Sequence, residues 1–346
     1  MSHLLDRLPA DILKELLDET DRFAVENVRA DRGGPFGSSI HVYDLNSGTL
    51  TAIGDLEANA VLATGMGSAH AEDQAMNPET ITALKDFLRA APETADHVVL
   101  FSSSGESCPA CHAKEEILSR SLIEEGLLAQ GRFVVTYGAT FEDTANIAGF
   151  NDAPYHDDMQ KPRGAGMISV DHKDASDIPA AVARIFEESD KPVSVIVQSG
   201  GQIIAGYADR DSDLMATSEV SAIRSAARAQ KADGVQTPWD LDGATLYTST
   251  SDVGPLGYAE CQWANVTGWV AVEHPRADDW ATQEARGISN TAFFDVIAAK
   301  QYNDPSSRVA VKRIEPFENK AQHAWRKKLD DSDDPSDVLY NGIACD

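Results

Sequence analysis

The chain is poor in basic residues, with Lys+Arg 29 against Asp+Glu 56 and a formal net charge of −27 over 346 residues. A surface this acidic repels phosphate backbones, so nucleic acid is not an expected partner. The compact basic cluster Arg326-Lys327-Lys328 is followed closely by Asp330 and Asp331. The excess of acid is typical of a highly soluble protein or of a salty environment.

Long apolar runs and a cysteine framework are also lacking. No apolar run approaches the length of a membrane span, so we expect no membrane association. The first residues lack the basic and apolar regions of a signal peptide. The chain has four cysteines, which argues against a disulfide scaffold, and we expect a cytoplasmic location.

The chain does contain enough apolar residues for a sizeable core, at 42% of the sequence, and its length suggests two or three domains. We place a boundary in the stretch 187–192. The first domain then covers 1–190 and the second covers 191–346. Residues 178–186 have the pattern of a last helix of the first domain.

The first domain alternates between strand and helix patterns. Helices are predicted over 4–30, from His70 to Leu84 and from Cys108 onwards, and strands over 39–43, 50–53, 97–101 and 132–137. Helices that cover a mixed sheet in this order predict a layered α/β fold.

The residues that carry chemistry lie in two short stretches. His70 and Glu72 form His-x-Glu, and Cys108 and Cys111 form Cys-x-x-Cys with Pro109 after the first Cys. One imidazole and two thiolates suit Zn²⁺ and leave a fourth tetrahedral position for water. A helix N-terminus at Cys108 would favour thiolates, and Pro109 suits the first helical turn. Glu72 is then free to move protons at the water.

Other readings of these stretches are a redox pair or half of a structural zinc site, because a lone Cys-x-x-Cys is common in both. The remaining cysteines, Cys261 and Cys345, do not form a second pair. The combination with His70 and Glu72, after a β-rich strand, favours a zinc deaminase centre in which the Glu is an acid and base.

The pattern resembles the cytidine-deaminase-like superfamily, and the first half is most similar to its bacterial guanine deaminase branch. Residues 33–37 match a G-G-P-F-G turn, 105–111 match x-E-P-C-P-x-C apart from Ser107, and 142–152 resemble a run ending in G-F-D-D. Two departures affect the base pocket. Residues 67–69 replace the family's D-P-T, and Ile117 stands where many members have an aromatic residue.

The resemblance implies roles for four further residues. Asn59, eleven residues before His70, would hydrogen-bond a base edge, and Phe36 would stack on the purine. Asp152 would face the polar edge of guanine, and the backbone N–H near Ala71 would be available to polar atoms of the base. The alternatives are a core position for Phe36, a loop cap for Asn59 and a helix N-cap for Asp152.

The second half repeats this pattern without metal ligands. In the matching register His70 becomes Thr217, the two cysteines become Gly254 and Gly257, and Glu219 is kept. Thr and Gly do not replace imidazole or thiolate on zinc. We therefore expect tandem three-layer α/β/α cytidine-deaminase-like domains with mixed sheets, the second degenerate.

The C-terminal part resembles the guanine branch as well. Residues 315–326 are similar to its P-F-x-A-W-R tail, and members of that branch form dimers in which this segment crosses to the partner. One hypothesis is an intramolecular pseudo-dimer, with the second half and the tail 335–346 closing the active site. A disordered acidic terminus is the alternative, and a further homodimer is left open.

The predicted function is a zinc-dependent hydrolytic deaminase of a small purine, with guanine to xanthine plus ammonia as the preferred reaction. A nucleoside or tRNA deaminase of adenosine or cytidine type is the alternative among enzymes, and the acidic charge counts against tRNA. A non-catalytic nucleobase-binding or regulatory protein is the alternative of another class. The intact set of metal ligands and Glu72 counts against it.

Overall fold

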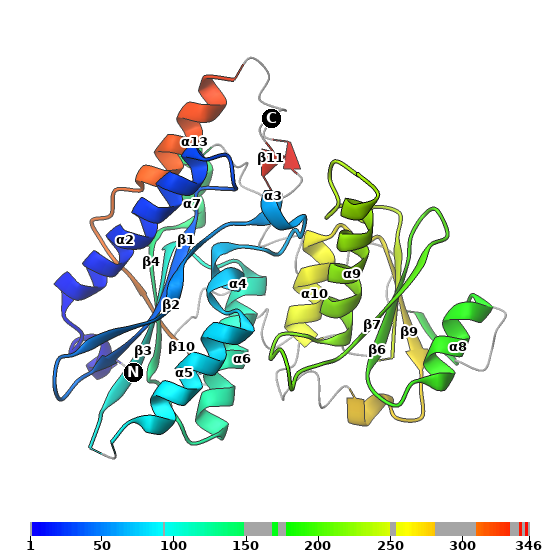
Figure 1. Cartoon of the computed structure of the whole chain (residues 1–346), viewed down its shortest axis with the longest axis horizontal. Coiled ribbons are helices and arrows are strands. Elements are labelled where there is room, and N and C mark those ends of the chain that lie inside the picture. The colour runs from blue at the N-terminus through cyan, green and yellow to red at the C-terminus, as the bar shows by residue number, and fades with distance from the viewer. Residues whose placement is uncertain are drawn as a thin grey trace. The chain divides into compact units, whose positions relative to one another are not determined.

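The computed structural model describes residues 2–92, 94–148, 168–171, 178–249, 254–280, 309–332, 339–340 and 343–344. These residues form two compact units, and each is built on a five-stranded mixed sheet with helices (Figure 1). The predicted α/β class with mixed sheets is confirmed. Within the described ranges, no helix has the length and apolar character needed to cross a membrane.

The first unit contains both the early part of the chain and a C-terminal segment. Its helices are α1 (Ser2–Leu5), α2 (Ala10–Arg29), α3 (Val61–Thr64), α4 (Ala71–Ala75), α5 (Pro78–Ala90), α6 (Pro109–Glu124), α7 (Phe141–Ala148) and α13 (Lys320–Asp330). Its strands are β1 (Gly37–Asp44), β2 (Leu50–Ala58), β3 (His97–Gly105), β4 (Phe133–Ala139) and β10 (Val309–Arg313), with a small β11 (Leu339–Tyr340) and β12 (Ile343–Ala344) pair.

The large sheet of this unit has the order β10-β4-β3-β1-β2. Strand β1 is antiparallel to both β2 and β3, whereas β3, β4 and β10 are parallel. Helix α2 covers one face, because Leu13, Leu16 and Leu17 recur at helical spacing and are buried against Leu100 and Val134. Helix α13 lies beside α2, and α4, α5 and α6 lie on the other side of the sheet (Figure 1).

The helix predicted from His70 to Leu84 is wrong in one respect, since the structure divides it into α4 and α5. Pro78 lacks the N–H needed to continue a helix and restricts the residue before it. Asn77 instead becomes the N-cap of α5, and its side chain accepts a hydrogen bond from the Thr80 N–H at 2.8 Å. Helix α4, which begins directly after His70, is therefore only five residues long.

The second unit contains β5 (Ile168–Asp171), α8 (Ala180–Glu188), β6 (Val193–Val197), β7 (Ile203–Tyr207), α9 (Ser218–Ala232), β8 (Thr245–Thr248), α10 (Gly254–Trp263) and β9 (Gly268–Glu273). Its sheet order is β5-β9-β8-β6-β7. Strand β6 is antiparallel to β7 and β8, and β8, β9 and β5 are parallel. The two sheets therefore share one order of strand positions and directions.

Helix α8, expected at the end of the first domain, belongs to the second unit. Val182 and Phe186 on this helix are buried against Val193 and Val195 of β6. The apolar face of α8 thus packs on the strand that follows it in the chain.

One edge strand of each sheet, β10 in the first and β5 in the second, lies out of order in the chain. Strand β5 follows the first four strands of the first sheet in sequence, yet it pairs with β9 of the second sheet. Strand β10 follows the strands of the second sheet, yet it pairs with β4 of the first, with Val309 opposite Phe133. The expected boundary at residue 190 does not capture this exchange.

The C-terminal segment is also joined to the first unit by side chains. Arg313 of β10 forms an ion pair with Asp143 of α7 at 2.8 Å, and Gln322 of α13 donates to the Thr144 hydroxyl at 2.7 Å. Trp325 is fully buried beside Val28 of α2. These contacts make residues 309–330 an integral part of the first unit.

Candidate metal centre

His70 lies at the start of α4, on the face of the first sheet opposite α2. It is the N-cap residue of the helix, Ala71 is the first helical residue, and Glu72 follows in the first turn. This spacing places the imidazole and the Glu72 carboxylate at the same helix end. Both residues are buried, with exposed fractions of 6% and 4%.

Cys108 and Cys111 lie at the start of α6, directly after β3. Cys108 is the N-cap, and its sulfur accepts a hydrogen bond from the Cys111 N–H at 3.5 Å. Pro109 occupies the first turn, as the sequence predicted. The turn therefore directs both sulfurs to one side of the helix N-terminus.

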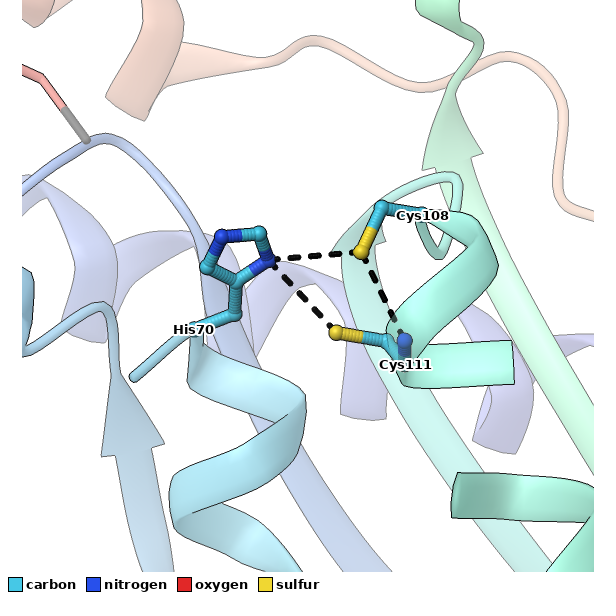
Figure 2. A group of neighbouring side chains, drawn as sticks. All are labelled: His70, Cys108 and Cys111. Carbon is cyan, nitrogen blue, oxygen red and sulfur yellow. Dashed lines mark hydrogen bonds between the residues drawn. The ribbon is translucent and has the colours of Figure 1, made fainter. Parts of the chain in front are cut away.

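The three predicted ligands meet at one point, as Figure 2 shows. His70 Nδ1 is 3.5 Å from the sulfur of Cys108 and 3.5 Å from that of Cys111. Tetrahedral zinc with bonds of about 2.0–2.3 Å to nitrogen and sulfur would hold such donors about 3.6 Å apart. All three donor atoms lie within 4.8 Å of one another. The donor set and its spacing therefore fit a zinc ion.

The electrostatics of the two thiols differ. Burial disfavours a charged Cys108, but the hydrogen bonds with Cys111 and His70 and the charge of His70 outweigh it and hold the Cys108 pKa well below its usual range. For Cys111, burial and the neighbouring Cys108 both raise the pKa. Cys108 is thus the sulfur prepared as a thiolate before any metal binds.

Glu72 stands beside the ligands without joining them. Its Oε1 accepts a hydrogen bond from the Ser103 hydroxyl of β3 at 2.8 Å, and its Oε2 lies 3.6 Å from the Cys111 sulfur. Burial raises the pKa of Glu72 to about 7, and the charge of His70 and the Ser103 hydrogen bond oppose this rise. A carboxyl group with a pKa near neutrality is suited to both taking and giving a proton.

Asn59 lies in the loop after β2 and is 1% exposed. Its Oδ1 accepts from the N–H of Gly34 at 3.2 Å and that of Val61 at 3.4 Å. Its Nδ2 is buried and has no hydrogen-bond partner among the described residues. The Oδ1 atom of Asn59 therefore holds the loop, and its Nδ2 remains available as a donor.

Phe36 is half-buried and packs against the cluster formed by Val28 and Trp325. Its ring also lies against Gly105, where an added Cβ would come within 2.8 Å of the ring. Glycine is needed there because any side chain would displace the ring.

Asp152 falls outside the described residues, so its predicted role stays a prediction.

Several residues near the centre were not foreseen from the sequence. Ser103 was one of three serines in a strand, with nothing local to mark it as the partner of Glu72. Lys114 and Asp73 form a buried ion pair at 2.6 Å. Glu115 binds the two residues that flank the cysteine turn, accepting from the Ser107 hydroxyl at 2.6 Å and pairing with His112 at 3.0 Å.

The second unit has no comparable group of three metal-binding side chains in its described residues. Glu219 in α9 is fully buried and accepts a hydrogen bond from the Thr248 hydroxyl of β8 at 2.8 Å, as Glu72 does from Ser103. Thr217 is the N-cap of α9, where His70 caps α4. An added Cβ on Gly257 would lie 3.3 Å from Glu219.

Comparisons with known proteins found partial similarity. No family model matches the chain, and no curated protein matches it. Among solved structures, guanine deaminase from Bacillus subtilis is 24% identical, covers 51% of this chain and 96% of its own, and has a TM-score of 0.33. Guanine deaminase from Nitrosomonas europaea is 20% identical, covers 42% and 68%, and has a TM-score of 0.28. Function is therefore inferred from the residues of the centre.

Proposed function

We propose that the protein is a zinc-dependent hydrolytic deaminase of a purine base, with guanine converted to xanthine and ammonia. One arrangement supports this function above all. His70, Cys108 and Cys111 direct a nitrogen and two sulfurs at one point, and the buried Glu72 carboxylate stands beside them without being a ligand. A purely structural zinc site would use a fourth protein ligand and would not need this carboxylate.

The chemistry assigned to the chain is proton transfer by Glu72. When bound, the metal supplies a water molecule of lowered pKa. As the water oxygen adds to the amino-bearing ring carbon, Glu72 takes a proton and gives it to a ring nitrogen. Glu72 then takes the second proton from the hydroxyl group now on that carbon and delivers it to the amine. The C–N bond breaks as the C=O bond forms, and ammonia leaves. Ser103 holds one carboxylate oxygen throughout and so fixes the other one.

The base would be held by residues around this centre. The spare Nδ2 of Asn59 is a buried donor that an acceptor atom on a base edge would satisfy. The N–H groups at the start of α4, including that of Ala71, suit a polar base atom. Phe36 would stack on the purine, and Asp152 would face the polar edge of guanine.

The second unit is proposed to be a degenerate copy of the first. The shared strand order and the matching pairs Glu72–Ser103 and Glu219–Thr248 support this origin. The exchange of β5 and β10 is the pattern of two subunits that traded edge strands before being joined in one chain. The protein would then be a pseudo-dimer with one chemical centre.

The direct test is ammonia release from guanine, adenine, cytosine and their nucleosides, together with zinc content, for wild type and Glu72→Gln. We expect turnover of guanine by wild type and about one zinc per chain in both proteins. Glu72→Gln should lose at least about 100-fold in kcat, since general acid and base catalysis contributes this much. Bound zinc without turnover of any small base would contradict the proposal and favour a binding protein.

The role of Asn59 has its own test, since the two ends of its amide do different work. Asn59→Asp keeps an oxygen for the N–H groups of Gly34 and Val61 but removes the donor. We expect kcat/KM for guanine to fall about 10- to 100-fold while zinc content is unchanged. A kcat/KM equal to that of wild type would restrict Asn59 to holding the loop.

A further inference from the structure

Helix α4 carries His70 at its N-cap and Glu72 in its first turn, yet it spans only Ala71–Ala75. A helix this short is not stable alone, because ordering the backbone of the first turn costs more free energy than its hydrogen bond contributes. Its place relative to α6, which carries both cysteines, must therefore come from contacts outside the helix. The ligands themselves offer weak contacts of 3.5 Å or more before a metal binds.

A strong contact joins the two helices at a second point. Lys114 Nζ of α6 lies 2.6 Å from Asp73 Oδ1 of α4, and the side chains are 0% and 9% exposed. The other carboxylate oxygen of Asp73 accepts from Gln74 Nε2 at 3.2 Å. Both carboxylate oxygens are thus engaged, and the ammonium group has a fixed position.

The sequence positions connect this pair to the centre. Asp73 directly follows Glu72, and Lys114 is one helical turn after Cys111. A shift of α4 along α6 would therefore separate the charges and the metal ligands together. The pair fixes the same relative position that the three ligands require.

Energetics argue that stability is not the reason for burying these charges. Removing two charges from water is costly, and a buried ion pair is often no more stable than apolar residues of similar volume. The pair instead fixes the position of α4 relative to α6, because a charged hydrogen bond tolerates little displacement.

We propose that Asp73 and Lys114 are positioning residues of the metal centre, which hold α4 against α6 so that His70 meets Cys108 and Cys111 before the metal binds. The inference rests on the proposed metal centre. It assigns Asp73 and Lys114 no part in the chemical step, only in the geometry of the donors.

The experiment measures zinc dissociation constants by competition with a chelator, and the free energy of unfolding of the zinc-free proteins. The variants are Lys114→Met, Asp73→Asn, the double variant, and the reversal Asp73→Lys with Lys114→Asp. Lys85→Met is the matched control, since Lys85 pairs with Glu125 at 2.5 Å at the opposite end of α6.

We expect Lys114→Met and Asp73→Asn to bind zinc about 10- to 100-fold more weakly, as when groups behind metal ligands are removed elsewhere. The double variant should lose less than the sum of the two, and Lys85→Met should bind zinc as wild type does. If Lys114→Met does not fold, Asp73→Asn decides, because the amide is close in size to the carboxylate and removes only the charge that pairs with Lys114.

Two outcomes would overturn the inference. In one, zinc affinity is unchanged in the single variants. In the other, the two residues couple in the free energy of unfolding but not in zinc affinity, which would make the pair merely structural. Wild type that binds no zinc would instead contradict the proposed function, so the two failures are distinguishable.

Discussion

The hydroxyl of Ser103 donates a hydrogen bond to the carboxylate of Glu72 at 2.8 Å, across from β3 to α4. This bond favours the charged form of Glu72 and so opposes the rise in its pKa that burial causes. In Ser103→Ala we expect the pKa of Glu72 to rise further, by about one unit.

Because the reaction needs Glu72 to accept a proton first, the acidic limb of the pH profile of kcat/KM should move to higher pH in Ser103→Ala. Ser102→Ala is the control, since the Ser102 hydroxyl bonds instead to Thr136 at 3.0 Å. An unshifted acidic limb in Ser103→Ala would show that this bond does not tune Glu72.

Zinc removal is expected to destabilise the first unit. A ligand that binds only the folded state stabilises it by about 4 kcal/mol when its free concentration is 1,000 times the dissociation constant. For a unit of this size that corresponds to roughly 10 °C in Tm. Thermal unfolding with and without a strong chelator checks this, and His70→Ala should show little response to the chelator. Equal Tm values for wild type would contradict a zinc-loaded fold.

His41 predicts a pH dependence of stability. It lies in β1 between Ala52 and Leu100, is 7% exposed, and its Nδ1 has no partner among the described residues. Burial lowers its pKa from 6.5 to about 4. Between pH 6.5 and about pH 4, the unfolded chain therefore binds a proton at His41 that the folded chain does not. The His41 contribution is complete above pH 6.5 and is lost as the pH falls towards 4.

The expected loss is up to about 1.4 kcal/mol of unfolding free energy per pH unit. Denaturant unfolding of wild type and His41→Gln between pH 4.5 and 7.5 measures it, with the exposed His323→Gln as control. The difference between wild type and His41→Gln should change with pH, whereas the control should follow wild type. A constant difference would exclude a buried neutral His41.

The C-terminal segment is predicted to be essential for the first unit. A chain ending at residue 308 lacks β10, which pairs with β4, and α13, whose Trp325 is fully buried. We expect this chain to aggregate, because the edge of β4 and an apolar surface become exposed. Addition of a peptide of residues 309–332 should restore solubility and zinc binding. A soluble, zinc-binding chain without that peptide would contradict the prediction.

A chain ending near residue 190, at the boundary expected from the sequence, would lack the same elements. Its failure would reflect the missing edge strand rather than a missing lid. A fairer test joins residues 1–148 to 309–332 through a flexible linker. Zinc binding by that chain would place the whole centre in the first unit.

Much of the centre could be predicted because it depends on local spacing. His-x-Glu and Cys-x-x-Cys fix residues on the first turns of two helices, and a strand before the cysteines fixes where α6 begins. The sequence also places Asn59 in a loop, although only the structure identifies its unpartnered Nδ2. Pro78 marks in the sequence the point where α4 and α5 separate. The apolar pattern on both sides of it nevertheless favoured one continuous helix.

The remainder depends on contacts between distant residues, which local patterns do not encode. Lys114 would be expected on a surface, and its burial becomes clear only when Asp73 is seen beside it. Strand β10 has an ordinary apolar pattern, and nothing in it names β4 as its partner. The exchange of edge strands therefore could not be read from propensity or spacing.

The exchange has a consequence for synthesis on the ribosome. Residues 309–313 leave the ribosome long after β4 does, so the first sheet keeps an open parallel edge while the second unit is being made. At about 5–20 residues per second, this interval lasts roughly 10–30 s. During that time the open edge of β4 can pair with a strand from a neighbouring chain. Premature termination late in the message would thus damage the part of the protein that was translated first.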